Sequence, residues 1–103
     1  EFMCASEVAD FVFWTIENLA QVPQNINLGL GYDYSIKDYY EKIAKIVGFD
    51  GQFTFDLSKP SGMRRKLCDI SKLESTGWKS KTTLEEGLKE TYNFYLRHIK
   101  NGV

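Results

Sequence analysis

The sequence has few of the features that stabilise very small proteins, such as disulfides and metal sites, and it has no long apolar segment of the kind that spans a membrane. Its 103 residues include only two cysteines, Cys4 and Cys68, and neither belongs to a Cys-x-x-Cys or Cys/His pattern. No disulfide framework and no metal site are indicated, and a reducing cytoplasm is the location that this composition favours. The longest apolar stretch, residues 11–14, is far shorter than the roughly 18 residues that a membrane helix needs.

A dominant charge of one sign is also missing. The formal net charge is -1. This balance gives no general attraction to nucleic acid or to an anionic membrane, so we expect neither as a partner. The chain begins Glu1-Phe2 instead of with methionine, which is compatible with a piece of a longer protein or with a remnant of cloning.

What the sequence does have is hydrophobic and aromatic side chains, 43% and 15% of the residues, which are enough for one core. We predict a single domain over residues 1–103. Its first helix is expected to be capped by Ser6 and to reach about Ala20, because apolar side chains recur there at spacings of three and four residues. Phe13 and Trp14 widen the apolar face of this helix and predict contact with a second surface.

A second helix is expected to begin at Ser35, with Asp38 as the reciprocal capping residue, and to end at Gly48. Asp69 is predicted to cap a short helix that ends at Gly77. Thr83 with Glu86 forms a capping box for a last long helix, and residues 100–103 are expected to fray. The predicted inward-facing side chains of the second helix are Tyr40, Ile43, Ala44 and Val47.

Two or three short strands are predicted between these helices, at residues 26–28 and 52–55 and, more briefly, at 66–68. Strands of this length cannot make a self-sufficient sheet. The predicted fold is therefore α/β: a small, mixed, helix-rich subdomain with two or three short strands that leans on a larger partner.

Positive charge is concentrated in residues 57–81, where seven basic side chains face two acidic ones for a local net charge of +5. An Arg64-Arg65-Lys66 run follows the Pro60-Ser61-Gly62 bend. Guanidinium and ammonium groups together suit the oxygens of a phosphate or diphosphate. The pattern indicates either a phosphate site or a solvated basic face.

Other candidate sites have weaker patterns. Gly29-Leu30-Gly31 before a helix could bind phosphate, but Tyr34 stands where the dinucleotide fingerprint needs its third glycine, so a strand-to-helix corner is the simpler interpretation. His98 lies away from the apolar stripe of its helix and is interpreted as a surface histidine. Cys4 and Cys68 are expected to be small buried hydrophobes.

The tyrosines give two alternatives. Tyr32, Tyr34, Tyr39 and Tyr40 could stack on a nucleobase, or they could pack in the core and at an interdomain contact. No tyrosine is followed four residues later by lysine, so the Tyr-x-x-x-Lys pair of a reductase is absent from the sequence. Redox catalysis by this chain alone is therefore not expected.

Several segments follow one another in the order found in a known family. Residues 27–31, 34–36 and 43–49 resemble the carboxy-terminal region of extended short-chain dehydrogenases. More specific is the segment FDLSKPSGMRRKLCD at residues 55–69. It is similar to the Phe-Asp-x-Ser-Lys-Pro-Asp-Gly-x-x-Arg-Lys-x-x-Asp segment of GDP-L-fucose synthases, and the Gly-Trp and Leu-Glu-Glu-Gly-Leu that follow continue the match.

The resemblance implies the substrate-binding region, without the Rossmann domain, of an NADPH-dependent enzyme. Such enzymes epimerise GDP-4-keto-6-deoxy-D-mannose at two carbons and reduce it to GDP-L-fucose. The resemblance implies that Lys66, Arg65 and Ser61 bind the GDP-sugar. The NADP(H) site and the catalytic residues would lie upstream, so no catalytic, cofactor or metal residue is assigned here, and the isolated chain is expected to be inactive and to bind no cofactor.

The implied partners are the GDP-sugar, the missing Rossmann domain and a second copy in a homodimer of the full-length enzyme. Ser61 stands where the family pattern has an aspartate, so a hydroxyl replaces a charged acceptor for sugar or ribose hydroxyls. Two alternatives therefore stay open. One is a paralogous enzyme for another GDP-linked 6-deoxy or heptose sugar, and the other is a stand-alone module that binds a phosphorylated ligand.

Overall fold

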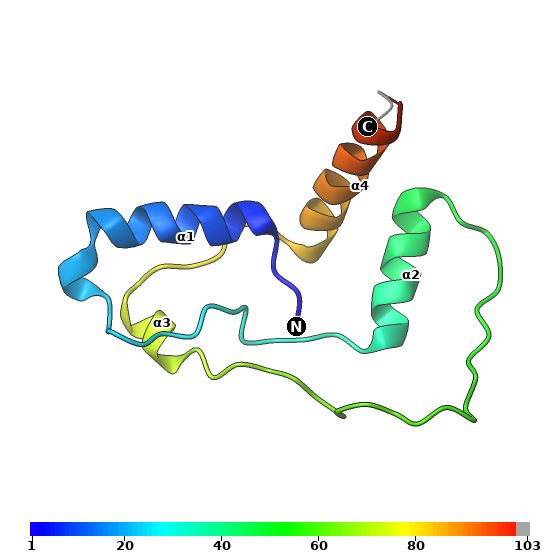
Figure 1. The fold of residues 1–103 in the computed structure, drawn as a ribbon, viewed down its shortest axis with the longest axis horizontal. Coiled ribbons are helices and arrows are strands. Elements are labelled where there is room, and N and C mark those ends of the chain that lie inside the picture. Colours follow the sequence, from blue (N-terminus) through cyan, green and yellow to red (C-terminus); the bar gives the residue numbers. More distant parts are fainter. Residues whose placement is uncertain (101–103) are drawn as a thin grey trace.

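The computed structural model describes residues 1–100, apart from the side chain of Lys100. The described residues form four α-helices and one short 3-10 helix. Figure 1 shows the helices arranged around an open frame, with a long extended segment between α2 and α3 along one edge. Of the residues predicted to fray, Lys100 is still helical, and residues 101–103 lie outside the described residues. The elements are α1 (Ala5–Glu17), η1 (Leu19–Gln21), α2 (Ile36–Val47), α3 (Ser71–Ser75) and α4 (Leu84–Lys100).

The β part of the predicted α/β fold was wrong, since residues 1–100 contain no strand. At the first expected strand, the Asn27 side chain donates to the Asp69 carbonyl at 3.0 Å, and at the third the Cys68 N–H donates to the Glu1 carboxylate at 3.1 Å. Residues 52–55 are exposed throughout. A ladder needs a neighbouring backbone, and here side chains bond these segments instead. The helix-rich part of the prediction was confirmed.

Two predicted capping boxes were confirmed. The Asp38 N–H donates to the Ser35 hydroxyl at 3.1 Å, and the Ser35 N–H donates to the Asp38 carboxylate at 2.9 Å. In the second box, the Glu86 N–H donates to the Thr83 hydroxyl at 3.3 Å, and the Thr83 N–H donates to the Glu86 carboxylate at 2.8 Å. Gly48 ends α2 with φ +74°, the left-handed conformation that favours glycine.

The boundaries of α1 differ from the prediction. Ser6 lies inside the first turn, and its hydroxyl donates to Glu90 at 3.4 Å instead of capping the helix. Ser6 therefore links α1 to α4. The helix ends at Glu17, before Ala20, because the Asn18 side chain donates to the Trp14 carbonyl at 2.8 Å and the chain then tightens into η1.

The α3 prediction was closer. The Ser71 N–H donates to the Asp69 carboxylate at 2.9 Å, but the N-cap residue of α3 is Ile70, one residue after the predicted cap. Gly77, with φ +81°, follows the end of α3. Local signals between residues two or three apart thus predicted this helix.

The buried core is small. Phe11 of α1, Leu73 of α3 and Trp78 form it, and the Phe11 and Trp78 rings meet edge to face with centroids 5.1 Å apart. On α2 the buried residue is Tyr39, whereas Tyr40, predicted to face inward, is half exposed. Ile43 and Val47 were also predicted to be inward and are likewise partly exposed.

Much apolar surface is left uncovered. On α1, Trp14 packs against the core but Phe13 is 70% exposed, and Val12 and Ile16 of α1 and Leu19 of η1 are also exposed. The radius of gyration is 17.0 Å, against about 13 Å for a compact domain of this length. An exposed apolar face of this kind is typical of an interaction surface.

One buried carboxylate ties α1 to the segment before α4. Glu7 is only 6% exposed. Its oxygens accept the Lys81 N–H at 3.1 Å, the Thr82 N–H at 2.9 Å and the Thr82 hydroxyl. Burial raises the pKa of Glu7, but the hydrogen bonds from Thr82 and the Lys81 backbone outweigh it and hold the pKa below the ordinary value of 4.5.

Glu7→Gln is expected to lower the free energy of unfolding by about 2–3 kcal/mol, because the charged acceptor of three hydrogen bonds is lost from a buried site. Urea unfolding at neutral pH checks this. The matched control is Glu17→Gln on the exposed part of the same helix, which is expected to change little.

The same pair of variants has a pH signature. A carboxyl whose folded pKa is lowered stabilises the folded state above its unfolded pKa and loses that contribution as pH falls through the folded value. The stability advantage of the wild type over Glu7→Gln should therefore be full above pH 4.5 and shrink in more acidic solution. A difference that does not change with pH would contradict the charged, hydrogen-bonded state of Glu7.

Candidate functional site

The three predicted site residues, Ser61, Arg65 and Lys66, lie on the extended segment between α2 and α3, which Figure 1 shows along the outer edge of the frame. All three are exposed. Among these three residues only Arg65 makes a side-chain hydrogen bond to the described chain, so the basic run is anchored at one of its positions.

Arg65 makes a forked ion pair with Asp33. The Arg65 Nε donates to Oδ2 of Asp33 and Nη2 donates to Oδ1, each at 2.9 Å. The Arg65 side chain is 63% exposed and that of Asp33 only 19%. Hydrogen bonds from Arg65 lower the pKa of Asp33, and Asp33 in turn raises the pKa of Arg65. This two-point geometry fixes the direction of the guanidinium.

A second carboxylate joins the same two parts of the chain. Glu1 accepts hydrogen bonds from the Leu30 N–H, from the Gly31 N–H at 3.1 Å and from the Cys68 N–H at 3.1 Å. Burial raises the pKa of Glu1, but these backbone hydrogen bonds lower it further than burial raises it. The glycine corner therefore binds a carboxylate of the chain itself, which supports its interpretation as a structural corner.

The corner is shaped for glycine. Gly31 has φ +75°, and a Cβ there would lie 2.5 Å from Cδ1 of Ile70. Ile70 follows the basic segment and packs against the core. Residues 29–31 and 68–70 are thus in close contact.

The tyrosines pack on one another. Tyr32 and Tyr34 meet edge to face at 5.9 Å, Tyr34 and Tyr39 do so at 5.6 Å, and Phe2 meets Tyr39 at 4.8 Å. Because Tyr39 is buried, these contacts favour the packing alternative for Tyr39. Tyr32, Tyr34 and Tyr40 keep exposed ring surface.

The remaining candidates have no catalytic arrangement in the described residues. His98 is exposed, as predicted, and its Nδ1 lies 2.9 Å from the Phe94 carbonyl on the same helix. Cys4 is half-buried, whereas Cys68 is exposed, so the expectation of a buried thiol was wrong for Cys68. Residues 1–100 contain no cluster of three or more potential metal ligands, and none of their helices has the length and apolarity to cross a membrane.

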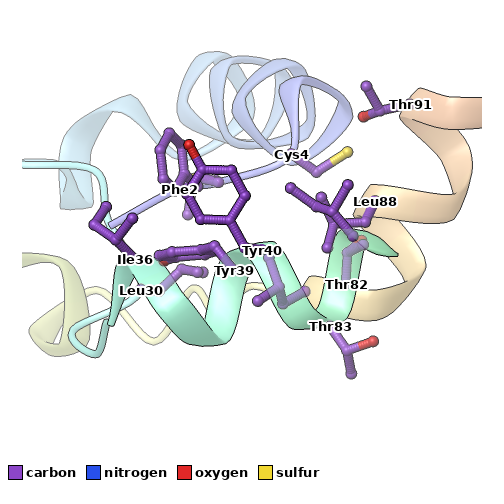
Figure 2. A pocket seen from close by; sticks show the side chains of 13 residues that line it. Phe2, Cys4, Leu30, Ile36, Tyr39, Tyr40, Thr82, Thr83, Leu88 and Thr91 are labelled. Carbon is purple, nitrogen blue, oxygen red and sulfur yellow. The ribbon is translucent and has the colours of Figure 1, made fainter. Parts of the chain in front are cut away.

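A cavity of about 460 Å³ lies between α2, the start of α4 and the amino-terminal residues. Figure 2 shows Phe2, Tyr39 and Tyr40 at one end of it and Cys4, Leu88 and Thr91 at the other. Its described lining carries no charged side chain. An anionic phosphate would find no ionic partner there, so this cavity is separate from the basic segment.

Sequence reasoning missed Glu1, Glu7 and Asp33. Each acts on a partner far along the chain, at separations of 67, 74 and 32 residues. A carboxylate has no local pattern that identifies such a partner. The one available signal was indirect: Asp33 follows a glycine corner, and Arg65 follows a Pro/Gly bend, so both lie where the chain turns.

Known proteins share both the sequence and the fold of this chain. The chain is 52% identical over 101 residues to the GDP-L-colitose synthase of Yersinia pseudotuberculosis, covering 98% of the chain and 33% of that protein. It is 38% identical over 96 residues to the GDP-L-fucose synthase of Azorhizobium caulinodans, covering 93% of the chain and 31% of the relative. No protein-family model matches the chain.

Solved structures agree with the sequence relatives. A GDP-6-OMe-4-keto-L-xylo-heptose reductase from Campylobacter jejuni superposes with a TM-score of 0.83 at 35% identity, over 94% of this chain and 30% of that one. A GDP-mannoheptose C4 reductase from the same organism, solved with NADP bound, gives 0.78 at 36% identity, over 93% and 31%. The chain spans about a third of the length of these relatives, and over that length it is similar in both sequence and fold to GDP-L-fucose and GDP-L-colitose synthases and to GDP-sugar reductases.

Proposed function

We propose that this chain is the carboxy-terminal, GDP-sugar-binding domain of an NADP-dependent GDP-sugar epimerase and reductase. The observation that carries the proposal is the 52% and 38% identity to GDP-sugar synthases over nearly the whole chain. The aligned length includes the basic segment at residues 55–69, so the likeness extends over the candidate site. The stand-alone module finds no support in these relatives, because each is about three times longer than this chain.

The proposed chemistry divides between two parts of the longer protein. In this chain, the exposed Lys66 ammonium neutralises the diphosphate of the GDP-sugar, and the Ser61 hydroxyl bonds a sugar or ribose hydroxyl. NADPH, bound by the other part, supplies the hydride that reduces the ketone. The residues here bind and orient the substrate without taking part in bond making.

The first activity to test is the conversion of GDP-4-keto-6-deoxy-D-mannose to GDP-L-fucose by the full-length protein. A GDP-L-colitose or GDP-heptose product is the second candidate, favoured by the 52% identity to a colitose synthase and by the serine at position 61. Incubation with NADPH, followed by chromatography against GDP-L-fucose and GDP-L-colitose standards, separates the two. If the full-length protein consumes no NADPH with any of the GDP-sugar substrates, the proposed function is rejected.

Lys66→Ala in the full-length protein is expected to weaken GDP-sugar binding by about 1–3 kcal/mol, because a charge-assisted bond to phosphate is lost. Titration calorimetry measures this. Lys59→Ala, in the same exposed segment, is the control for a general loss of positive charge and should have a much smaller effect. Equal losses from both variants would indicate a diffuse basic face instead of a Lys66 contact.

The other part of the longer protein is proposed to cover the exposed face of α1. Phe13→Asp is then expected to lower the free energy of unfolding of the full-length protein by about 2–3 kcal/mol, because a charge would be buried without a partner. The control is Leu57→Asp, at an apolar position that is 92% exposed and lies outside α1. Equal and small effects of both substitutions on thermal unfolding would contradict a covered α1 face.

A further inference from the structure

Two contacts fix the chain on either side of Lys66. On one side, Arg65 is held by both oxygens of Asp33. On the other side, the Cys68 N–H is held by Glu1, whose carboxylate also binds the Gly31 N–H. Lys66 lies between these anchors, and no carboxylate of the described chain pairs with its ammonium.

The Asp33 pair changes what Arg65 can do. Both the Nε and Nη2 donors on one edge of its guanidinium are used by Asp33. A neighbouring carboxylate also offsets the cation, so the pair as a whole offers a diphosphate little net attraction. What the forked pair does provide is restraint: it fixes both side chains and therefore restrains the backbone that carries them.

We propose that Asp33 is a positioning residue of the GDP-sugar site, and that Arg65 anchors the basic segment through Asp33 instead of contacting phosphate itself. This inference rests on the proposed function. Lys66 then supplies the phosphate contact from a backbone that is already fixed. A site that is fixed before binding loses less conformational freedom when the ligand arrives, and this is the source of the gain in affinity.

Opposite charge changes make the inference testable. Asp33→Ala makes the net charge of the protein one unit more positive, and Arg65→Ala makes it one unit more negative. If only the local charge mattered, the first variant would bind an anion more tightly and the second more weakly. If the pair acts as an anchor, both variants weaken binding, and the double variant is no weaker than either single one.

The experiment is titration calorimetry of the full-length protein with GDP as the probe. We expect Asp33→Ala, Arg65→Ala and their combination each to weaken GDP binding about threefold to tenfold. Because the pair acts through Lys66, loss of the pair is expected to add little further weakening in the Lys66→Ala background. In steady-state assays, KM for the GDP-sugar should rise for the pair variants while kcat stays near that of the wild type, because Asp33 and Arg65 touch no reacting atom.

Two further variants guard against a simple folding defect. The exchange Asp33→Arg with Arg65→Asp rebuilds the pair in reverse and is expected to restore GDP binding to within about twofold. Arg65→Lys keeps the charge but loses the fork, and it should weaken binding as much as Arg65→Ala.

Three outcomes would overturn the inference. Tighter or unchanged GDP binding by Asp33→Ala, with weaker binding by Arg65→Ala, would make Arg65 a phosphate ligand. An exchanged pair that folds with the wild-type thermal midpoint but does not regain GDP binding would do the same. A wild-type protein that binds no GDP would refute the proposed function, and this inference with it, so the two failures are distinguishable.

Discussion

The arrangement of the helices depends on one buried carboxylate, that of Glu7. Glu7 reaches from the first turn of α1 to the backbone of Lys81 and Thr82, just before α4 begins. Burying a carboxylate is costly unless its oxygens are hydrogen-bonded, and here three donors meet it. The direction in which the chain enters α4 is therefore set by a residue 74 positions earlier.

Glu1 and Asp33 also use a carboxylate to join distant parts of the chain, in this case loops. A strand would satisfy its backbone through a neighbouring strand, but the expected strand positions have none. Glu1 bonds the N–H groups of both the glycine corner and the segment after the basic run, and Asp33 bonds the side chain of Arg65. These carboxylates therefore hold the two loops together and keep the basic segment, residues 55–69, beside the glycine corner at residues 29–31.

Sequence reasoning succeeded where the interaction is local. The Ser35–Asp38 and Thr83–Glu86 boxes were predictable because each pairs residues three positions apart. The strand predictions at 26–28 and 52–55 failed, because apolar alternation says nothing about whether a partner strand exists. The candidate site was found from charge and from its resemblance to a family segment, yet the Asp33 contact was missed because nothing local links positions 33 and 65.

The exposed apolar face of α1 and the anchored basic segment lead to one physical interpretation. A core built on Phe11, Leu73 and Trp78 buries little surface, and hydrophobic stabilisation scales with the apolar area removed from water. A domain with so thin a core gains stability by covering that face. The carboxylate contacts work differently, since they fix short segments without a large core. Under the proposed function, local carboxylate contacts hold the segment that carries Lys66, and a neighbouring surface supplies the remaining stability.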